Sequence, residues 1–290
     1  MSLSARLPDF AALMRLDRPI GIWLLLWPTA WALWIAGDGH PAAGTVLVFA
    51  LGVVLMRSAG CVINDWADRH VDGQVARTAG RPLITGRVSG DEALALFALL
   101  VLASASLLLF LPLAVFWWSF GALALATLYP FMKRYTYLPQ VVLGAAFSWA
   151  IPMAFVAQGK SPDALCWLLY ASNLAWTVAY DTLYAMADRD DDLKAGVKST
   201  AILFGELDLA ITGFLQALFL TGLGLVGQRL DLGWPWWAGL AGAAVLCLLQ
   251  LRQAASRSPD DCLAAFRANH SVGVLLMLSL LGGWLYRATS

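Results

Sequence analysis

The chain has 290 residues, of which 60% are hydrophobic and only 13% are charged, and its 19 basic and 19 acidic residues cancel to a net charge of zero. A soluble domain carries about 25% charged residues, so the composition excludes an ordinary water-exposed surface. The lack of net basic charge also excludes a general nucleic-acid binder. The composition therefore predicts a protein whose solvent is mainly the lipid bilayer.

The first 19 residues mix charges and prolines with short apolar groups, and they lack the order of regions of a cleavable signal peptide. We expect residues 1–19 to form an amphipathic cytoplasmic segment on the membrane surface, with Phe10, Leu13 and Met14 on its apolar side. We expect residues 20–290 to form a single domain.

Apolar runs fill the rest of the chain. A helix crosses the hydrocarbon of a membrane in about 20 residues. Nine runs meet this length, and they cover residues 20–37, 44–63, 92–110, 112–130, 138–157, 163–183, 208–227, 234–251 and 270–286. The sequence therefore predicts an all-α membrane protein with nine transmembrane helices.

The basic residues predict the orientation of these helices. If the N-terminus is cytoplasmic, only Lys160, Arg229 and Arg287 of the 19 basic residues fall on the opposite side, which leaves 16 in the cytoplasm. Such an excess is typical of cytoplasmic loops and places the C-terminus outside. Most acidic residues share the cytoplasmic side, which insertion does not require, so we expect a functional use for carboxylates there.

Two of the cytoplasmic loops resemble each other. The first reads ADRHVDGQVARTAGRPLITG from Ala67, and the second reads ADRDDDLKAGVKSTAILFG from Ala187. When they are aligned on ADR, Asp68 matches Asp188. Asp72 likewise matches Asp192. The pattern indicates a two-fold pseudo-repeat of aspartate-rich loops.

The acidic residues of the first loop fall on a stripe. If the helix continues, Asn64, Asp68 and Asp72 share one face at spacings of four residues. Asp65 lies about 100° round the helix from Asn64, and its role stays open.

In the second loop, Asp181, Asp188 and Asp192 also share a face. Asp191 points elsewhere and is interpreted as a solvated or secondary contact. Carboxylates of one charge on one face repel each other, so both stripes indicate a bound cation.

The donor atoms narrow the choice of cation. Carboxylates and one amide without cysteine or histidine are hard oxygen ligands, which suit Mg²⁺, Mn²⁺ or Ca²⁺. Basic residues alternate with the acids, so we expect an anion that bridges metal and cations, and diphosphate is the natural candidate. A diphosphate that needs an intramembrane cavity is expected to carry a lipid tail, as an isoprenoid diphosphate does.

Four stretches resemble a known family. NDWADRHVDGQVARTAGRPL resembles the NDxxDxxxD motif of the UbiA superfamily of intramembrane prenyltransferases, and YDTLYAMADRDDDLKAGVKSTAILFG resembles its second aspartate motif. RLDRPIGIWLLLWPTAWALW and LYPFMKRYTYLPQVVLGAAFSWAIPMAF are similar to the branch that acts on 4-hydroxybenzoate. The resemblance covers roughly residues 10–290.

The resemblance implies a fold and a reaction. Nine helices would surround a central cavity with a cytoplasmic cap and a lateral opening for a lipid tail, in the bacterial inner membrane. The expected reaction moves a polyprenyl group from polyprenyl diphosphate to the ring carbon of 4-hydroxybenzoate ortho to the hydroxyl, an early step of ubiquinone synthesis. Two Mg²⁺ ions would assist, one held by Asn64, Asp68 and Asp72 and the other by Asp188 and Asp192.

Basic residues complete the predicted site. The expected contacts to diphosphate are Arg69, Lys133, Arg134, Lys194 and Lys198. Arg57 lies in an apolar stretch seven residues before Asn64, where an arginine wants an anionic partner. That partner is either the carboxylate of 4-hydroxybenzoate, which we favour, or a structural aspartate. Arg18 is a weaker candidate for the aromatic substrate.

Several alternatives stay open at this point. The proton-accepting base could be Asp188, Asp191 or the released diphosphate. The acceptor could be another aromatic, of the naphthoate, homogentisate, haem or chlorophyll type. A cation transporter is the alternative of another class, although transporters place their ion site near the membrane midplane. The oligomeric state is also open.

Overall fold

The computed structural model describes residues 3–69 and 78–290, and every regular element in these ranges is a helix. The elements are α1 (Leu3–Leu13), α2 (Ile20–Ala36), α3 (Ala43–Asp68), α4 (Gly90–Leu107), η2 (Leu108–Phe110), α5 (Leu113–Tyr135), α6 (Pro139–Ser148), α7 (Ala150–Ala157), α8 (Ala164–Ala195), α9 (Thr200–Phe204), η3 (Gly205–Leu207), α10 (Asp208–Leu230), α11 (Gly233–Ala254) and α12 (Pro259–Thr289). The all-α prediction is confirmed.

The helices begin and end where local chemistry dictates. Ser89 and Glu92 form a capping box at the start of α4, in which each side chain accepts a hydrogen bond from the backbone N–H of the other. Ser258 caps α12 through the amide of Asp261, and Pro259 takes the first helical position, where its missing N–H is not needed. Gly196 ends α8 in the left-handed conformation that glycine adopts without strain.

All nine predicted apolar runs lie in helices. In the described part of the chain, seven helical stretches are long and apolar enough to span a membrane: Ala43–Asp68, Gly90–Phe110, Leu113–Tyr135, Pro139–Ala157, Thr200–Leu230, Gly233–Ala254 and Pro259–Thr289. The other two predicted runs coincide with α2, which is apolar but has only 17 residues, and with α8, which carries the second acidic motif.

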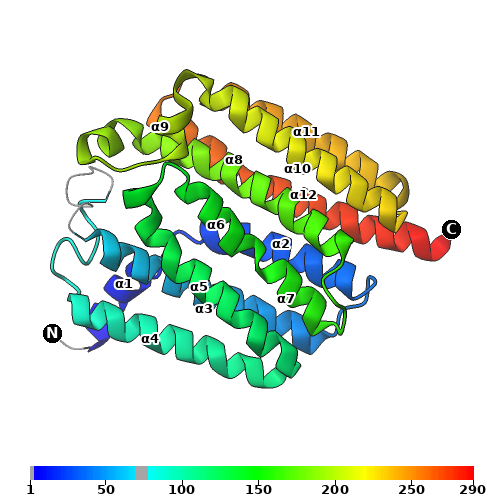
Figure 1. Cartoon of the computed structure of the whole chain (residues 1–290), viewed down its shortest axis with the longest axis horizontal. Helices are drawn as coiled ribbons and strands as arrows, with labels where there is room; N and C mark the ends of the chain where they lie inside the picture. Colours follow the sequence, from blue (N-terminus) through cyan, green and yellow to red (C-terminus); the bar gives the residue numbers. More distant parts are fainter. Residues whose placement is uncertain (1–2, 70–77) are drawn as a thin grey trace.

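The long helices run side by side in one bundle (Figure 1). α11 packs along α12, α10 packs along α8, and α3 packs along α4. α2 and α6 lie between these groups, and the two termini lie at opposite ends of the bundle. The cytoplasmic ends that the sequence predicts for α3 and α8 therefore lie at the end of the bundle that holds α1.

Aromatic residues join the helices at the centre of the bundle. Trp176 of α8 stacks on Phe219 of α10 with 5.0 Å between ring centroids, and Trp31 of α2 lies 5.4 Å away. The indole N–H of Trp176 donates to Asn269 of α12 at 2.8 Å, so the buried polar atom is satisfied. These contacts hold α2, α8, α10 and α12 together.

The N-terminal helix packs on protein. Leu13 is fully buried in a cluster with side chains of α3 and α4, and Phe10 and Met14 pack against the same cluster. The three residues share one side of the segment, as the sequence predicts, and this side packs against the bundle. Burial against helices removes this apolar area from water, as insertion into lipid would. A salt bridge of 2.5 Å between Arg6 and Glu92 also joins α1 to α4.

Candidate functional site

A cavity of about 820 Å³ opens between α2, α3, α5, α6 and α8. Asn64 and Asp68 line it from α3, and Asp188 and Asp192 line it from α8. The structure thus brings the two predicted acidic motifs to one cavity. Asp72, the last carboxylate of the first motif, lies outside the described residues.

Asp68 is buried and forms an ion pair with Lys133, which lies in the last turn of α5 and also lines the cavity. The neighbouring Arg134 donates to the carbonyl oxygen of Ala67 at 2.5 Å. These consecutive residues of α5 therefore point in different directions, because Lys133 faces the cavity while Arg134 binds the end of α3.

Of the other predicted diphosphate contacts, one lines the cavity and two do not. Lys198 lines the cavity and lies over the ring of Tyr137. Arg69 stacks on the ring of Trp66 at 4.3 Å, and Lys194 is 77% exposed and pairs with Asp191 at 3.4 Å. Among the described lining residues, Arg69, Arg134 and Lys194 are absent, so the structure does not bring these three to the cavity.

The cavity holds three further cations that our sequence-based contact set omits: Arg15, Arg81 and Arg267. Arg15 follows α1, Arg81 precedes α4, and Arg267 lies in α12. Arg81 belongs to the basic residues that alternate with the acids of the first motif, whereas only a position on the predicted cytoplasmic side pointed to Arg15 and Arg267.

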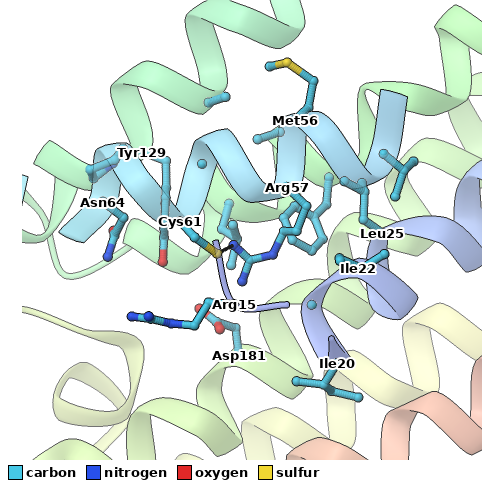
Figure 2. A pocket seen from close by; sticks show the side chains of 18 of the residues that line it. Arg15, Ile20, Ile22, Leu25, Met56, Arg57, Cys61, Asn64, Tyr129 and Asp181 are labelled. Atoms are coloured by element: carbon cyan, nitrogen blue, oxygen red, sulfur yellow. Dashed lines mark hydrogen bonds between the residues drawn. The ribbon is translucent and has the colours of Figure 1, made fainter. Parts of the chain in front are cut away.

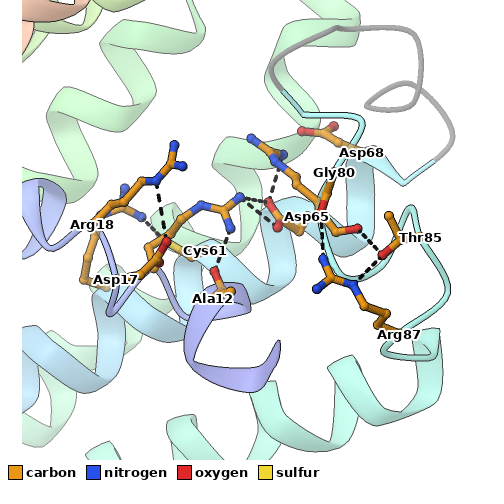
Figure 3. A network of polar contacts seen from close by, with 12 residues as sticks. Ala12, Asp17, Arg18, Cys61, Asp65, Asp68, Gly80, Thr85 and Arg87 are labelled. Carbon is orange, nitrogen blue, oxygen red and sulfur yellow. Dashed lines mark hydrogen bonds and ion pairs between the residues drawn. The ribbon is translucent and has the colours of Figure 1, made fainter. Parts of the chain in front are cut away.

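Asp65 faces two arginines. It is 2% exposed, and its carboxylate accepts from Arg15 Nη2 at 2.8 and 2.9 Å and pairs with Arg81 Nη1 at 2.9 Å. Figure 3 shows Asp65 within this network at the end of α3. The role that the sequence left open is therefore an ion-paired one, which ties α3 to the segments after α1 and before α4.

Arg57 projects from α3 into the cavity (Figure 2). Its Nη1 donates to Cys61 Sγ at 2.7 Å, and its guanidinium lies 5.8 Å from the ring centroid of Phe147. The Nε atom is buried without a hydrogen-bond partner in the structure. Asp181 of α8 lies across the cavity, close enough for the two charges to attract each other.

Arg18 is at the edge of the cavity. Its side chain is 77% exposed and pairs with Asp17 at 3.5 Å. This exposure matches an interfacial arginine better than a buried substrate contact.

The acidic side chains fit a hard divalent cation. Within residues 3–69 and 78–290, no group of three or more histidine, cysteine or acidic side chains lies close enough to hold a metal. Asn64 and Asp68 nevertheless face the same cavity as Asp188 and Asp192, and all four offer only oxygen ligands, with the amide oxygen for Asn64. Such a set suits Mg²⁺, which needs few protein carboxylates when phosphate oxygens complete its coordination.

Apolar side chains line much of the rest of the cavity. They come from α3, α6, the end of α4 and the segment after η2, and they include Phe49, Val53, Leu107, Leu111, Leu143 and Phe147. A molecule that fills both parts needs an anionic head and an apolar tail.

The fold and the site thus define a helical membrane protein with a cavity that acidic, basic and apolar side chains line together. The sequence model of the UbiA prenyltransferase family matches residues 25–280. This match covers most of the chain, and the chain belongs to that family.

Relatives and solved structures agree with this assignment. The chain is 56% identical to a 4-hydroxybenzoate octaprenyltransferase of Chromohalobacter salexigens, over 95% of this chain and 93% of the relative. It is 54% identical to the protein of the same name from Pseudomonas aeruginosa UCBPP-PA14, over 98% and 96%. A UbiA homologue from Aeropyrum pernix has the same fold, with a TM-score of 0.78 at 24% identity, over 92% of this chain and 98% of the homologue.

A UbiA homologue from Archaeoglobus fulgidus bound to GPP and Mg²⁺ also shares the fold. Its TM-score is 0.71 at 20% identity, and the match covers 97% of this chain and 99% of the homologue.

Proposed function

We propose that the protein transfers a polyprenyl group from polyprenyl diphosphate to the ring carbon of 4-hydroxybenzoate ortho to its hydroxyl, with release of diphosphate, in ubiquinone synthesis. The observation that carries this proposal is one cavity that brings two acidic motifs and cationic side chains together with apolar walls. The names of relatives that are 54–56% identical over nearly the whole chain support 4-hydroxybenzoate as the acceptor.

The polar end of the cavity would bind the diphosphate. Asn64, Asp68, Asp188 and Asp192 would hold Mg²⁺, together with Asp72 as the sequence predicts. Bound Mg²⁺ supplies positive charge that neutralises the leaving diphosphate. The homologue bound to GPP and Mg²⁺ supports this use of the cavity.

Lys133 and Lys198 would contact diphosphate oxygens directly. Lys133 is paired with Asp68 in the structure, so it is already held at the acidic end of the cavity. When the bond between the allylic carbon and the diphosphate oxygen breaks, the electron pair leaves with the oxygen, and these ammonium groups stabilise that charge.

Arg57 would bind the carboxylate of the acceptor. A buried guanidinium is costly without an anion, and its Nε has no hydrogen-bond partner in the structure. A planar guanidinium binds a carboxylate through two parallel hydrogen bonds, which would orient the aromatic ring. The ring carbon then attacks the allylic carbon and loses its proton. Asp188 would accept this proton, because it lines the cavity, whereas Asp191 pairs with Lys194 outside it.

The membrane topology is part of the proposal. We infer that α2 and α8 span the bilayer together with the seven apolar helical stretches, which makes nine spans. The N-terminus and the acidic motifs would then face the cytoplasm and the C-terminus the other side of the bacterial inner membrane, as the excess of basic residues predicts.

Purified protein in lipid nanodiscs tests the function. With polyprenyl diphosphate, 4-hydroxybenzoate and Mg²⁺, we expect mass spectrometry to show the 3-polyprenyl product and an equal amount of released diphosphate, and a chelator to stop both. Naphthoate and homogentisate serve as competing acceptors. Preference for one of these would refute the acceptor assignment, and a cation transporter would release no diphosphate at all.

Gly21→Ala is expected to raise the KM for 4-hydroxybenzoate. A Cβ atom at Gly21 of α2 would lie 2.6 Å from Arg57 Nη2 and 2.8 Å from its Cζ, so the guanidinium would have to move. Overpacking of this kind costs about 1–3 kcal/mol. Steady-state kinetics with varied acceptor measure the effect.

Gly44→Ala is the matched control. Gly44 is exposed near the start of α3, and a Cβ there meets nothing within 4 Å. Both substitutions gain helix propensity, so only the displacement of Arg57 separates them. An equal KM in the two variants would contradict the packing argument.

A further inference from the structure

A buried carboxylate also lies outside the cavity, at the start of α10. Asp208 has no exposed surface. Arg257, between α11 and α12, donates to it through Nε at 3.1 Å and through Nη2 at 2.9 Å, and Arg189 of α8 donates to Oδ2. The amide of Leu209 adds a hydrogen bond at 2.6 Å. One carboxylate thus joins three segments of the chain.

This arrangement repeats that of Asp65 in the other half of the protein. Asp65 is 2% exposed and pairs with Arg15 and Arg81, which come from two further segments (Figure 3). In each half, a buried aspartate is bound by two arginines that are distant from each other in sequence. We call these two groups the Asp65 clamp (Asp65, Arg15, Arg81) and the Asp208 clamp (Asp208, Arg189, Arg257).

One arginine of each clamp has an unfavourable backbone conformation. Arg15 has φ of 59° and Arg257 has φ of 54°, and they are two of the four non-glycine residues with positive φ in the described ranges. This region is unfavourable for a residue with a Cβ atom and persists only where the surroundings enforce it. Each guanidinium also binds a backbone carbonyl, that of Ala12 for Arg15 and that of Glu206 for Arg257.

Both clamps adjoin the acidic motifs. Asp65 lies between Asn64 and Asp68 in α3, and Arg189 directly follows Asp188 in α8. Successive helical residues are rotated by about 100°, so a side chain that is fixed on one face sets the direction of its neighbours. Arg189, held by Asp208, therefore sets the direction in which Asp188 and Asp192 point.

The end of α8 needs such an anchor. Its last two turns carry Asp188, Asp190, Asp191 and Asp192, whose like charges repel each other and would favour fraying. The Asp208 clamp supplies an attachment for these turns on the side away from the cavity.

We propose that Asp65 and Asp208 are positioning residues, and that each clamp locks the helix end that carries one acidic motif so that the two motifs face each other across the cavity. This inference rests on the proposed function only in taking the motifs as the metal and diphosphate ligands. The arginines engage the carboxylate oxygens of the clamps, so Asp65 orients the site and does not ligate metal.

Asp208→Asn tests the Asp208 clamp. The amide keeps the size of the side chain but presents N–H groups to two guanidinium groups. Loss of a partner that orients metal ligands costs about 10- to 100-fold in metal affinity, and we expect this loss in the Mn²⁺ affinity measured by electron paramagnetic resonance on substrate-free protein. The half-saturating Mg²⁺ concentration for transfer should rise in parallel, while the KM for 4-hydroxybenzoate stays unchanged.

Three further variants sharpen the test. Asp65→Asn should likewise lower the Mn²⁺ affinity and leave the KM for 4-hydroxybenzoate unchanged. Asp208→Glu should recover part of the Mn²⁺ affinity. Asp260→Asn, which changes an exposed carboxylate at the start of α12, should match wild type. If Asp208→Asn fails to fold, Arg257→Gly serves instead, because glycine adopts the left-handed backbone without strain while the guanidinium is lost.

The outcomes separate clearly. Wild-type Mn²⁺ affinity in folded Asp208→Asn or Arg257→Gly protein would overturn the proposal. So would an equal fall of all kinetic parameters that follows the folded fraction in thermal unfolding, because this would mark a merely structural role. Absence of transfer by the wild-type protein would refute the proposed function instead, and the Mn²⁺ affinities would still test the clamps.

Discussion

Asp68→Asn is expected to lower Mg²⁺-dependent prenyl transfer by about a hundredfold or more, since several kcal/mol of charge stabilisation are lost and each 1.36 kcal/mol is tenfold in rate. Asp68 is buried at the polar end of the cavity, where it faces the second acidic motif and pairs with Lys133. The amide can neither neutralise a cation nor replace the carboxylate as a strong ligand. Product formation by mass spectrometry at saturating Mg²⁺ measures the effect.

Two controls isolate the chemistry from the fold. Asp190→Asn makes the same change in the second motif at an exposed side chain and should leave transfer at the wild-type rate. Asp68→Asn leaves Lys133 without its carboxylate, so we also expect a lower unfolding temperature, which Asp68→Asn combined with Lys133→Met should restore without restoring transfer. Recovery of transfer in that double variant would contradict a role of Asp68 in the reaction.

Arg57→Gln is expected to remove the preference for a charged acceptor. Hydrogen bonds to charged groups contribute about 1.5–3 kcal/mol, so kcat/KM for 4-hydroxybenzoate should fall about 10- to 150-fold. The uncharged 4-hydroxybenzamide should lose little, because it has no carboxylate for Arg57 to bind. The ratio of kcat/KM for the two acceptors measures the effect, and the KM for polyprenyl diphosphate should not change.

Asp181 provides the control for this prediction, because it lies across the cavity from Arg57. If Arg57 only balanced Asp181, Arg57→Gln would leave a buried carboxylate uncompensated, and both acceptors would lose activity equally. Adding Asp181→Asn would then restore activity with both. We expect instead that the double variant still fails to distinguish the two acceptors.

The helices and the acidic stripes could be predicted because they follow from local pattern. The nine apolar runs lie in helices with ends within a few residues of those expected, apart from α3, α5, α8 and α12, which extend beyond their runs. Hydropathy does not detect these extensions, because they contain charged residues, and those of α3 and α8 carry residues of the acidic motifs. The spacing of Asn64 and Asp68 and the repeat at Asp188 and Asp192 likewise predicted which side chains would meet at the cavity.

The basic residues show that local sequence pattern does not predict which side chains face the cavity. Lys133 and Arg134 are adjacent and chemically alike, yet only Lys133 faces the cavity, because α5 presents one residue to the site and the next to the carbonyl of Ala67. Arg69 lies next to a motif aspartate but stacks on Trp66. Charge and proximity in sequence cannot distinguish these cases, since the direction of a side chain depends on its helix and its neighbours.

The sequence by itself determined that this is an all-α membrane protein with paired acidic motifs, since hydrophobic runs and residue spacing are properties of consecutive residues. Only the tertiary structure decided what Asp65 and Asp208 do. Their arginine partners lie 16 to 50 residues away in Arg15, Arg81, Arg189 and Arg257, in segments that meet only when the bundle closes. A carboxylate in the sequence can bind metal, substrate or a guanidinium equally well, and the choice depends on which charge the fold places beside it.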